Sequence, residues 1–200
     1  MTNNKSIYSI NYIKIKIKIF FFVTKITRSK LNKTRTYTQN FPFQKFNQVF
    51  VFKLSSWVTN SSFSGGGFVF DLEPGSHTYG SIGMRQTPSP LHAEFNILLC
   101  AMKSSLQIGY TSMSFQSDCL QLVKLINEEE DWPSLASEWN EFTFLVSEFN
   151  SFSISFIARS INVRADLLAK GARLQNSLLS HVNSLIPTWL ASQANLFVLN

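Results

Sequence analysis

Residues 89–119 read SPLHAEFNILLCAMKSSLQIGYTSMSFQSDC and predict a helix that leads into a strand. Ser89-Pro90 supplies a cap and a first-turn proline, and Gly109 ends the helical pattern. Apolar residues recur at helical spacing between them, at Leu91, Phe95, Leu98, Leu99, Met102 and Leu106. Residues 111–116 predict a short strand, after which Ser117 or Asp118 would cap the next helix. This alternation of helix and strand is typical of an α/β fold.

Three strands are expected before this helix. Residues 49–58 are rich in Val, Phe and Trp, and residues 66–72 form a second apolar run. Glu73-Pro74-Gly75 is a strong turn signal, after which residues 77–84 return as a third strand. Short turns between successive strands favour an antiparallel three-stranded layer.

The segments after residue 119 continue the alternation. Two helices are predicted by the apolar residues Leu122, Val123, Leu125 and Ile126, and by Leu135, Trp139, Phe142, Leu145, Val146 and Phe149. Residues 152–156 alternate apolar and Ser as a strand, and Asn162 is expected to cap a last helix. The order β-β-β-α-β-α-α-β-α predicts a mixed sheet with an antiparallel hairpin layer, parallel βαβ crossovers and flanking helices.

Charge is segregated along the chain. Residues 1–50 hold ten of the eighteen Lys and Arg and no Asp or Glu, so residues 51–200 hold eight basic and twelve acidic residues, a net charge of −4. Nucleic-acid binding driven by counterion release needs clustered cations. If the folded part binds nucleic acid, it would therefore depend on a few local cations or on bridging metal ions.

Residues 1–50 form a compositionally biased, basic segment without Gly or Ala. Its longest apolar run, residues 19–23, is far shorter than the roughly 18 residues that a spanning helix needs, so no membrane partner is expected. An organelle transit peptide is one interpretation. We favour another, in which codons rich in A and T reflect translated intron or upstream sequence; a continuous transcript through residue 50 would contradict it.

The expected organisation has three parts: the segment 1–50, disordered or mis-annotated, a domain over residues 51–175, and a C-terminal tail over residues 176–200 that packs on the domain. Cys100 and Cys119 are too few for a disulfide framework and are not spaced as a zinc site. An intracellular, reduced protein is therefore expected, with the nucleus or an organelle as possible compartments.

Three acidic residues lie near the ends of predicted elements. Glu94 follows the start of the first helix, Asp118 follows a strand, and Asp166 lies in the first turns of the last helix. Each alone is explained as a helix cap or as a partner of the helix dipole. Together, acids that converge at one edge of a sheet suit magnesium ions in phosphoryl transfer.

The segments that carry these acids, SPLHAE, FQSDC and NVRADLLAK, resemble motifs of the ribonuclease H family, in particular the reverse transcriptase-like type-1 domains abundant in plant genomes. The resemblance covers residues 56–173. It implies an α/β ribonuclease H-like fold with a five-stranded mixed sheet and an RNA/DNA hybrid as substrate. It also implies that Glu94, Asp118 and Asp166 are catalytic ligands of Mg²⁺, with Mn²⁺ as a substitute. His92 and Arg164 are not counted as catalytic.

One position departs from the family's pattern. The family has a metal-binding Asp on the first strand, in a D-x-S-W stretch, where this chain reads Leu54-Ser55-Ser56-Trp57. Leucine has no oxygen for a metal, so two-metal hydrolysis is expected to be impaired. Asp71 is not expected to substitute, because it lies at the far end of the second strand.

Three hypotheses follow. The first is an RNA/DNA hybrid endoribonuclease, and the second is a catalytically degenerate or retroelement-derived domain that still binds nucleic acid. The third is an α/β protein whose acids are helix caps and whose Trp139 helix contacts a protein partner. Magnesium-dependent cleavage separates the first from the second, and hybrid binding separates the second from the third.

Overall fold

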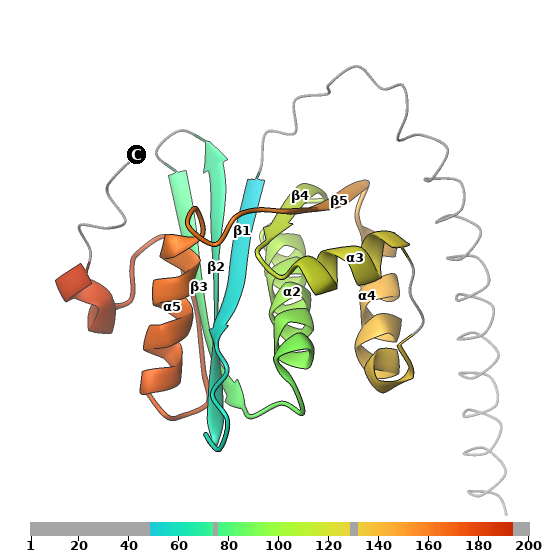
Figure 1. The fold of residues 1–200 in the computed structure, drawn as a ribbon. Coiled ribbons are helices and arrows are strands. Elements are labelled where there is room, and N and C mark those ends of the chain that lie inside the picture. Colours follow the sequence, from blue (N-terminus) through green and yellow to red (C-terminus); the bar gives the residue numbers. More distant parts are fainter. Residues whose placement is uncertain (1–48, 74–75, 129–131, 194–200) are drawn as a thin grey trace, which may run out of the picture. The chain divides into compact units, whose positions relative to one another are not determined.

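The computed structural model describes residues 49–73, 76–128 and 132–193, all of which belong to one compact unit, Lys45–Asn200. The expected segment 1–50 lies almost entirely outside the described residues. The strands form one sheet in the order β5-β4-β1-β2-β3-β6 (Figure 1). Their bounds are β1 Val49–Ser56, β2 Phe63–Glu73, β3 Ser76–Arg85, β4 Ser112–Ser117, β5 Ser151–Phe156 and β6 Leu179–Asn183.

The strand directions agree with the prediction of a mixed sheet. β1 and β3 each pair with β2 in antiparallel fashion, whereas β4 is parallel to both β1 and β5. Because a parallel neighbour needs a crossover, the helical segments lie where the chain passes from β3 to β4 and from β4 to β5. All five strands expected from the sequence are present, with bounds shifted by a few residues.

The sixth strand is the main difference from the expected sheet. After the last helix the chain turns at Asn176, which has a φ of 49°, and Leu179–Asn183 then pairs antiparallel with β3. The segment expected to be a tail therefore extends the sheet. Its sequence, LSHVN, is short and largely exposed, so it lacks the buried alternation by which strands are found.

The helices begin and end near the predicted signals. Their bounds are α2 Pro90–Gln107, α3 Leu120–Glu128, α4 Ala136–Glu148 and α5 Val163–Leu174, with short 3-10 turns η2 Pro133–Leu135 and η3 Thr188–Gln193. The backbone N–H of His92 donates to the hydroxyl of Ser89, which confirms the predicted cap. Gly109 follows α2 with a φ of 91°, a conformation that favours glycine. Among the described residues no helix is long and apolar enough to cross a membrane.

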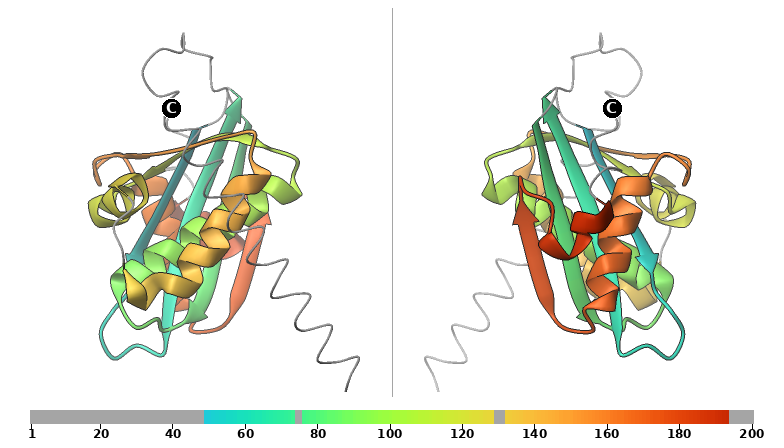
Figure 2. Two further views of the ribbon diagram at one scale, coloured as in Figure 1. Left: turned by 90° about the vertical axis from the view of Figure 1, so that its right-hand side faces the viewer. Right: turned by 90° about the vertical axis from the view of Figure 1, so that its left-hand side faces the viewer.

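The larger core lies between the sheet and the helices α2, α3 and α4. Phe68 and Phe70 of β2 are fully buried there, together with Phe95 of α2 and Phe115 of β4. The left view of Figure 2 shows α2 and α4 crossing this face of the sheet. Phe142 of α4 makes an edge contact with Phe95, with ring centroids 5.7 Å apart. This aromatic packing fixes α2, the helix that carries Glu94.

The opposite face of the sheet is covered by α5 and η3, as the right view of Figure 2 shows. A smaller core forms here from Val69, Tyr79, Leu168 and Leu190. Leu190 is only 4% exposed although it lies beyond residue 175. The C-terminal segment thus contributes apolar contacts as well as a strand to the described unit.

The substitution Leu190→Ala tests whether residues after 175 are part of the folding unit. Removing this buried side chain is expected to lower the free energy of unfolding by about 2 to 5 kcal/mol. The matched control is Leu185→Ala, because Leu185 is 71% exposed and should cost under about 0.5 kcal/mol. Equilibrium urea denaturation measures both, and equal effects would support a domain that ends near residue 175.

Candidate nuclease site

Asp118 follows β4 directly and is linked to the start of α5. The side-chain amide of Asn162 donates from Nδ2 to Oδ1 of Asp118 over 3.3 Å. Asn162 occupies the position before α5, as predicted, but its side chain makes no capping hydrogen bond to the helix. A residue that the sequence predicts as a helix cap therefore joins the last helix to the end of a central strand.

Glu94 lies in α2 and is only 7% exposed, which is unusual for a carboxylate. Its negative charge interacts with the thiol of Cys119, which follows Asp118 after β4. Burial, then the charge of Glu94 and more weakly that of Asp118, raise the pKa of the Cys119 thiol to about 11; backbone N–H groups of Leu122 and Gln121 act in the opposite direction. Glu94 and Asp118 are therefore close enough to act on the same thiol.

Asp166 lies in the first turn of α5, as predicted. Its carboxylate forms an ion pair with Lys170 one turn later, over 2.7 Å, and its side chain is 15% exposed. The backbone N–H of Asp166 donates to the carbonyl of Asn162. The residue that bonds Asp118 thus lies one turn before Asp166 on the same helix.

The backbone of Leu54 lies next to these elements. In β1, Phe52 is opposite Ser117 of β4, so Leu54 and Asp118 lie at the same end of two neighbouring parallel strands. Lys53 is opposite Gly67 of β2. A Cβ on Gly67 would lie 2.2 Å from the carbonyl oxygen of Ala165, so the first turn of α5 packs directly over this register position. Leu54 is the next residue after Lys53, and the register of β1 with β2 is irregular between Lys53 and Ser56, so the backbone of Leu54 lies one residue from the position that faces the first turn of α5.

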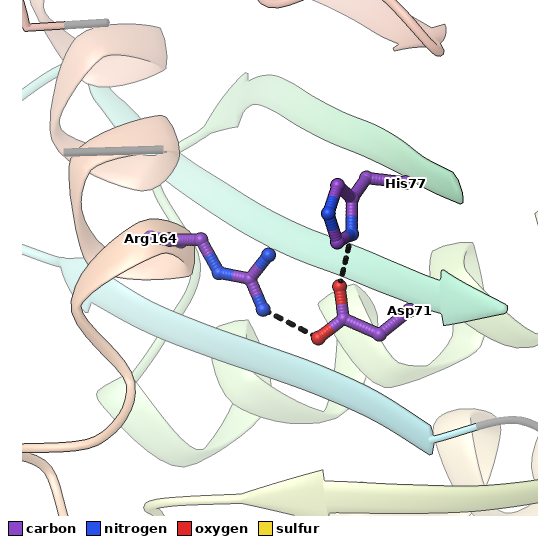
Figure 3. Close-up of polar contacts among 3 residues, drawn as sticks. All are labelled: Asp71, His77 and Arg164. Atoms are coloured by element: carbon purple, nitrogen blue, oxygen red, sulfur yellow. Dashed lines mark hydrogen bonds and ion pairs between the residues drawn. The ribbon is translucent and has the colours of Figure 1, made fainter. Parts of the chain in front are cut away.

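Asp71 lies at the other end of this pair of strands, as expected. It is opposite Val49, five residues before Leu54, which places it about 16 Å away along β1. Its carboxylate instead accepts hydrogen bonds from His77 Nδ1, over 2.7 Å, and from Nη2 of Arg164 (Figure 3). Asp71 and His77 face each other across β2 and β3, a pairing that follows once the register is known.

Two contacts of the site region were not found from the sequence. The Asn162–Asp118 pair joins residues 44 positions apart, and the Asp71–Arg164 pair joins residues 93 positions apart. Neither has a local sequence signal. His92, which was not counted as catalytic, bonds Ser89 through Nδ1 and the carbonyl of Ser134 through Nε2, so it connects the start of α2 to η2.

The carboxylates are the kind of ligand that magnesium prefers, but they do not form a complete set of ligands around one ion. Mg²⁺ prefers oxygen ligands, keeps several waters and needs only one or two carboxylates. Within residues 49–73, 76–128 and 132–193, however, no three His, Cys, Asp or Glu side chains lie close enough to hold an ion. Asp166 is paired with Lys170, and Leu54 offers no oxygen. Glu94 and Asp118, which both lie near Cys119, are therefore the pair best suited to hold a largely hydrated ion.

The fold is shared with solved ribonucleases H. RNase H1 of the archaeon Halobacterium salinarum superposes with a TM-score of 0.53 at 20% identity, over 65% of this chain and 97% of that one. The N-terminal RNase H domain of a Mycobacterium tuberculosis protein gives 0.57 at 21% identity, over 64% and 94%. LC11-RNase H1, isolated from compost and solved with an RNA/DNA hybrid, gives 0.58 at 18% identity, over 64% and 97%.

These likenesses define an RNase H-like α/β fold, which confirms the predicted fold class. Residues 55–172, more than half of the chain, match the reverse transcriptase-like family, and the chain belongs to that family. It is thus a reverse transcriptase-like RNase H domain that shares its fold with solved ribonucleases H at about 20% identity. No curated protein matches the chain.

The reactivity of Cys119 tests whether Glu94 lies beside the end of β4. A pKa of about 11 leaves roughly 0.1% of the thiol ionised at pH 8, against roughly 10% at the ordinary value of 9.0, so alkylation should be slow. In a Cys100→Ala background, Glu94→Gln removes one cause of the raised pKa. We expect severalfold faster reaction with iodoacetamide and a lower midpoint in its pH profile.

Glu141→Gln is the matched control for this measurement. Glu141 lies near Cys100 and forms an ion pair with Lys103, so its loss should not change the rate at Cys119. If Glu94→Gln also left the rate unchanged, Glu94 would not lie near the end of β4.

Proposed function

We propose that this domain binds RNA/DNA hybrids and hydrolyses their RNA strand, at a rate limited by Leu54. Glu94, Asp118 and Asp166 are its catalytic carboxylates. The observation that carries the proposal is that the end of β4 is bonded to the start of α5 through Asn162 and Asp118, while the charge of Glu94 in α2 acts on Cys119 beside Asp118. The hybrid bound to LC11-RNase H1, a protein of the same fold, supports the choice of substrate.

Magnesium, or manganese in its place, would be held by Glu94 and Asp118, with Asp166 joining if it leaves Lys170. When bound, the metal would activate the attacking water and stabilise the leaving oxygen of the phosphodiester. Asn162 would orient Asp118 through the hydrogen bond to Oδ1. The burial of Glu94 excludes water from one side of the site and strengthens its interaction with a cation.

Leu54 removes one carboxylate from the position where the family places its first-strand Asp. The loss of one metal contact worth about 3 to 4 kcal/mol corresponds to a rate lower by roughly several hundred-fold. The domain's own charge adds little attraction for nucleic acid, since residues 51–200 carry a net charge of −4. Binding of the hybrid is therefore expected to be weak and cleavage slow.

A second candidate function is hybrid binding without cleavage. Leu54 favours it, and so does the ion pair of Asp166 with Lys170, which uses a carboxylate that hydrolysis would need. In this case the domain would be a degenerate, retroelement-derived member of its family. The two candidates differ in one measurable property, which is whether a carboxylate at position 54 restores hydrolysis.

The decisive variant is Leu54→Asp in the 200-residue chain. With magnesium or manganese, it should cleave a labelled RNA/DNA hybrid several hundred times faster than the natural chain. Leu54→Asn is the matched control, because it supplies an oxygen without the charge and should restore much less. Adding Asp118→Asn to Leu54→Asp should abolish the gain.

The same assay separates the alternatives. If Leu54→Asp binds the hybrid in a mobility-shift assay but does not cleave it, the site is degenerate beyond one ligand and the second candidate holds. If neither chain binds the hybrid, both candidates fail and the three acids act as helix caps.

A further inference from the structure

A second cluster of charged side chains joins the end of β2 to the first turn of α5. Asp71, at the end of β2, accepts one hydrogen bond from His77 of β3 and one from Arg164 of α5 (Figure 3). Because a carboxylate only accepts, Nδ1 of His77 carries the proton. The three side chains are 25 to 30% exposed, so the cluster is shielded but reached by water.

The cluster is too far from Leu54 to supply a ligand, yet it acts on the helix turn that carries part of the site. Arg164 lies between Asn162, which bonds Asp118, and Asp166. Any change in the position of Arg164 therefore moves both residues together, because the first turn of a helix behaves as one unit. Although Asp71 lies far from Leu54 along the sheet, the cluster is connected through α5 to Asn162 and Asp166.

The first turn of α5 is held at three points on the sheet. Asn162 is bonded to Asp118 after β4, the carbonyl of Ala165 packs against Gly67 in the middle of β2, and Arg164 is bonded to Asp71 at the end of β2. The body of the helix is held as well, because the hydroxyl of Ser81 donates to the carbonyl of Leu168. Within the first turn, the Arg164–Asp71 pair is the charged contact with β2, on the side away from Asp118.

The body of α5 does not need this cluster to stay on the sheet. Its apolar side, made of Ala165, Leu168, Ala169 and Ala172, is fully buried. The ion pair lies outside this contact, and ion pairs that water reaches contribute little to stability. Its main effect is therefore expected on the orientation of the first turn and not on folding.

We propose that Arg164, held by Asp71 and His77, is a positioning residue that fixes the first turn of α5 so that Asn162 and Asp166 meet Asp118. The inference rests on the proposed function for its catalytic consequence, though not for the position of Asn162. The planar guanidinium is suited to this role, because its fork of N–H groups fixes the direction of a carboxylate contact, which a lysine ammonium does not.

The catalytic consequence is measured in the Leu54→Asp background. Arg164→Ala should raise the magnesium concentration for half-maximal cleavage and lower kcat, each by about 10-fold, as is common when a residue that orients a metal ligand is lost. KM for the hybrid and the thermal midpoint should change little. Arg164→Lys should rescue only part of the loss, and Asp71→Ala combined with Arg164→Ala should cost no more than either change alone.

A second readout needs no activity. In the natural chain, Arg164→Ala should shift the side-chain amide resonances of Asn162 in a nitrogen–proton NMR spectrum. Lys103→Ala is the control, since it breaks the Lys103–Glu141 ion pair between α2 and α4 and should leave these resonances in place.

The two readouts separate the proposals. If the Asn162 amide shifts while Leu54→Asp shows no cleavage, the positioning of Asn162 by Arg164 stands and the hydrolytic function fails. If the amide does not move, or if Arg164→Ala leaves the magnesium dependence of an active Leu54→Asp chain unchanged, Arg164 is an ordinary surface ion pair and the inference is overturned.

Discussion

The backbone of α5 lies directly against two glycines of β2, and this close approach positions the last helix. A Cβ on Gly65 would lie 2.0 Å from the carbonyl oxygen of Ala169, and one on Gly67 would lie 2.2 Å from that of Ala165. No side chain fits into either gap, so only glycine lets the helix backbone touch the sheet at these positions. This contact sets the distance between α5 and the sheet. It therefore determines where the first turn of α5 lies.

The site is a consequence of this packing together with the direction of β4. Because β4 is parallel to β1, its carboxyl end lies beside the end of β1, and Asp118 follows there. The aromatic core packs α2 on the sheet, and the charge of the buried Glu94 in this helix acts on Cys119, next to Asp118. Two helices, α2 and α5, and the strand β4 thus pack beside β1. If the domain hydrolyses phosphodiesters, as proposed, Leu54 is the substitution that weakens its chemistry.

Much of the fold follows from local patterns, whereas the contacts of the site do not. The turn signal in the sequence at residues 73–75, the Ser89 cap and Gly109 each mark the end of an element for a local physical reason, so β2, β3 and α2 were predicted correctly. Strand β6 was missed because its exposed residues carry no buried alternation. Glu94, Asp118 and Asp166 were predicted as site residues from family motifs, and this remains a prediction. The contacts of Asn162 with Asp118 and of Arg164 with Asp71 depend on tertiary packing that no local pattern encodes.

If the carboxylates near Leu54 form a divalent-cation site, Mn²⁺ bound there should broaden the backbone amide resonances around it, because paramagnetic broadening falls steeply with distance from the ion. We expect loss of signal centred on Glu94, Asp118 and Cys119 in the natural chain, and at lower Mn²⁺ concentration in Leu54→Asp. Broadening centred on Asp71 or on residues 128–131, or an equal response of both chains, would contradict it.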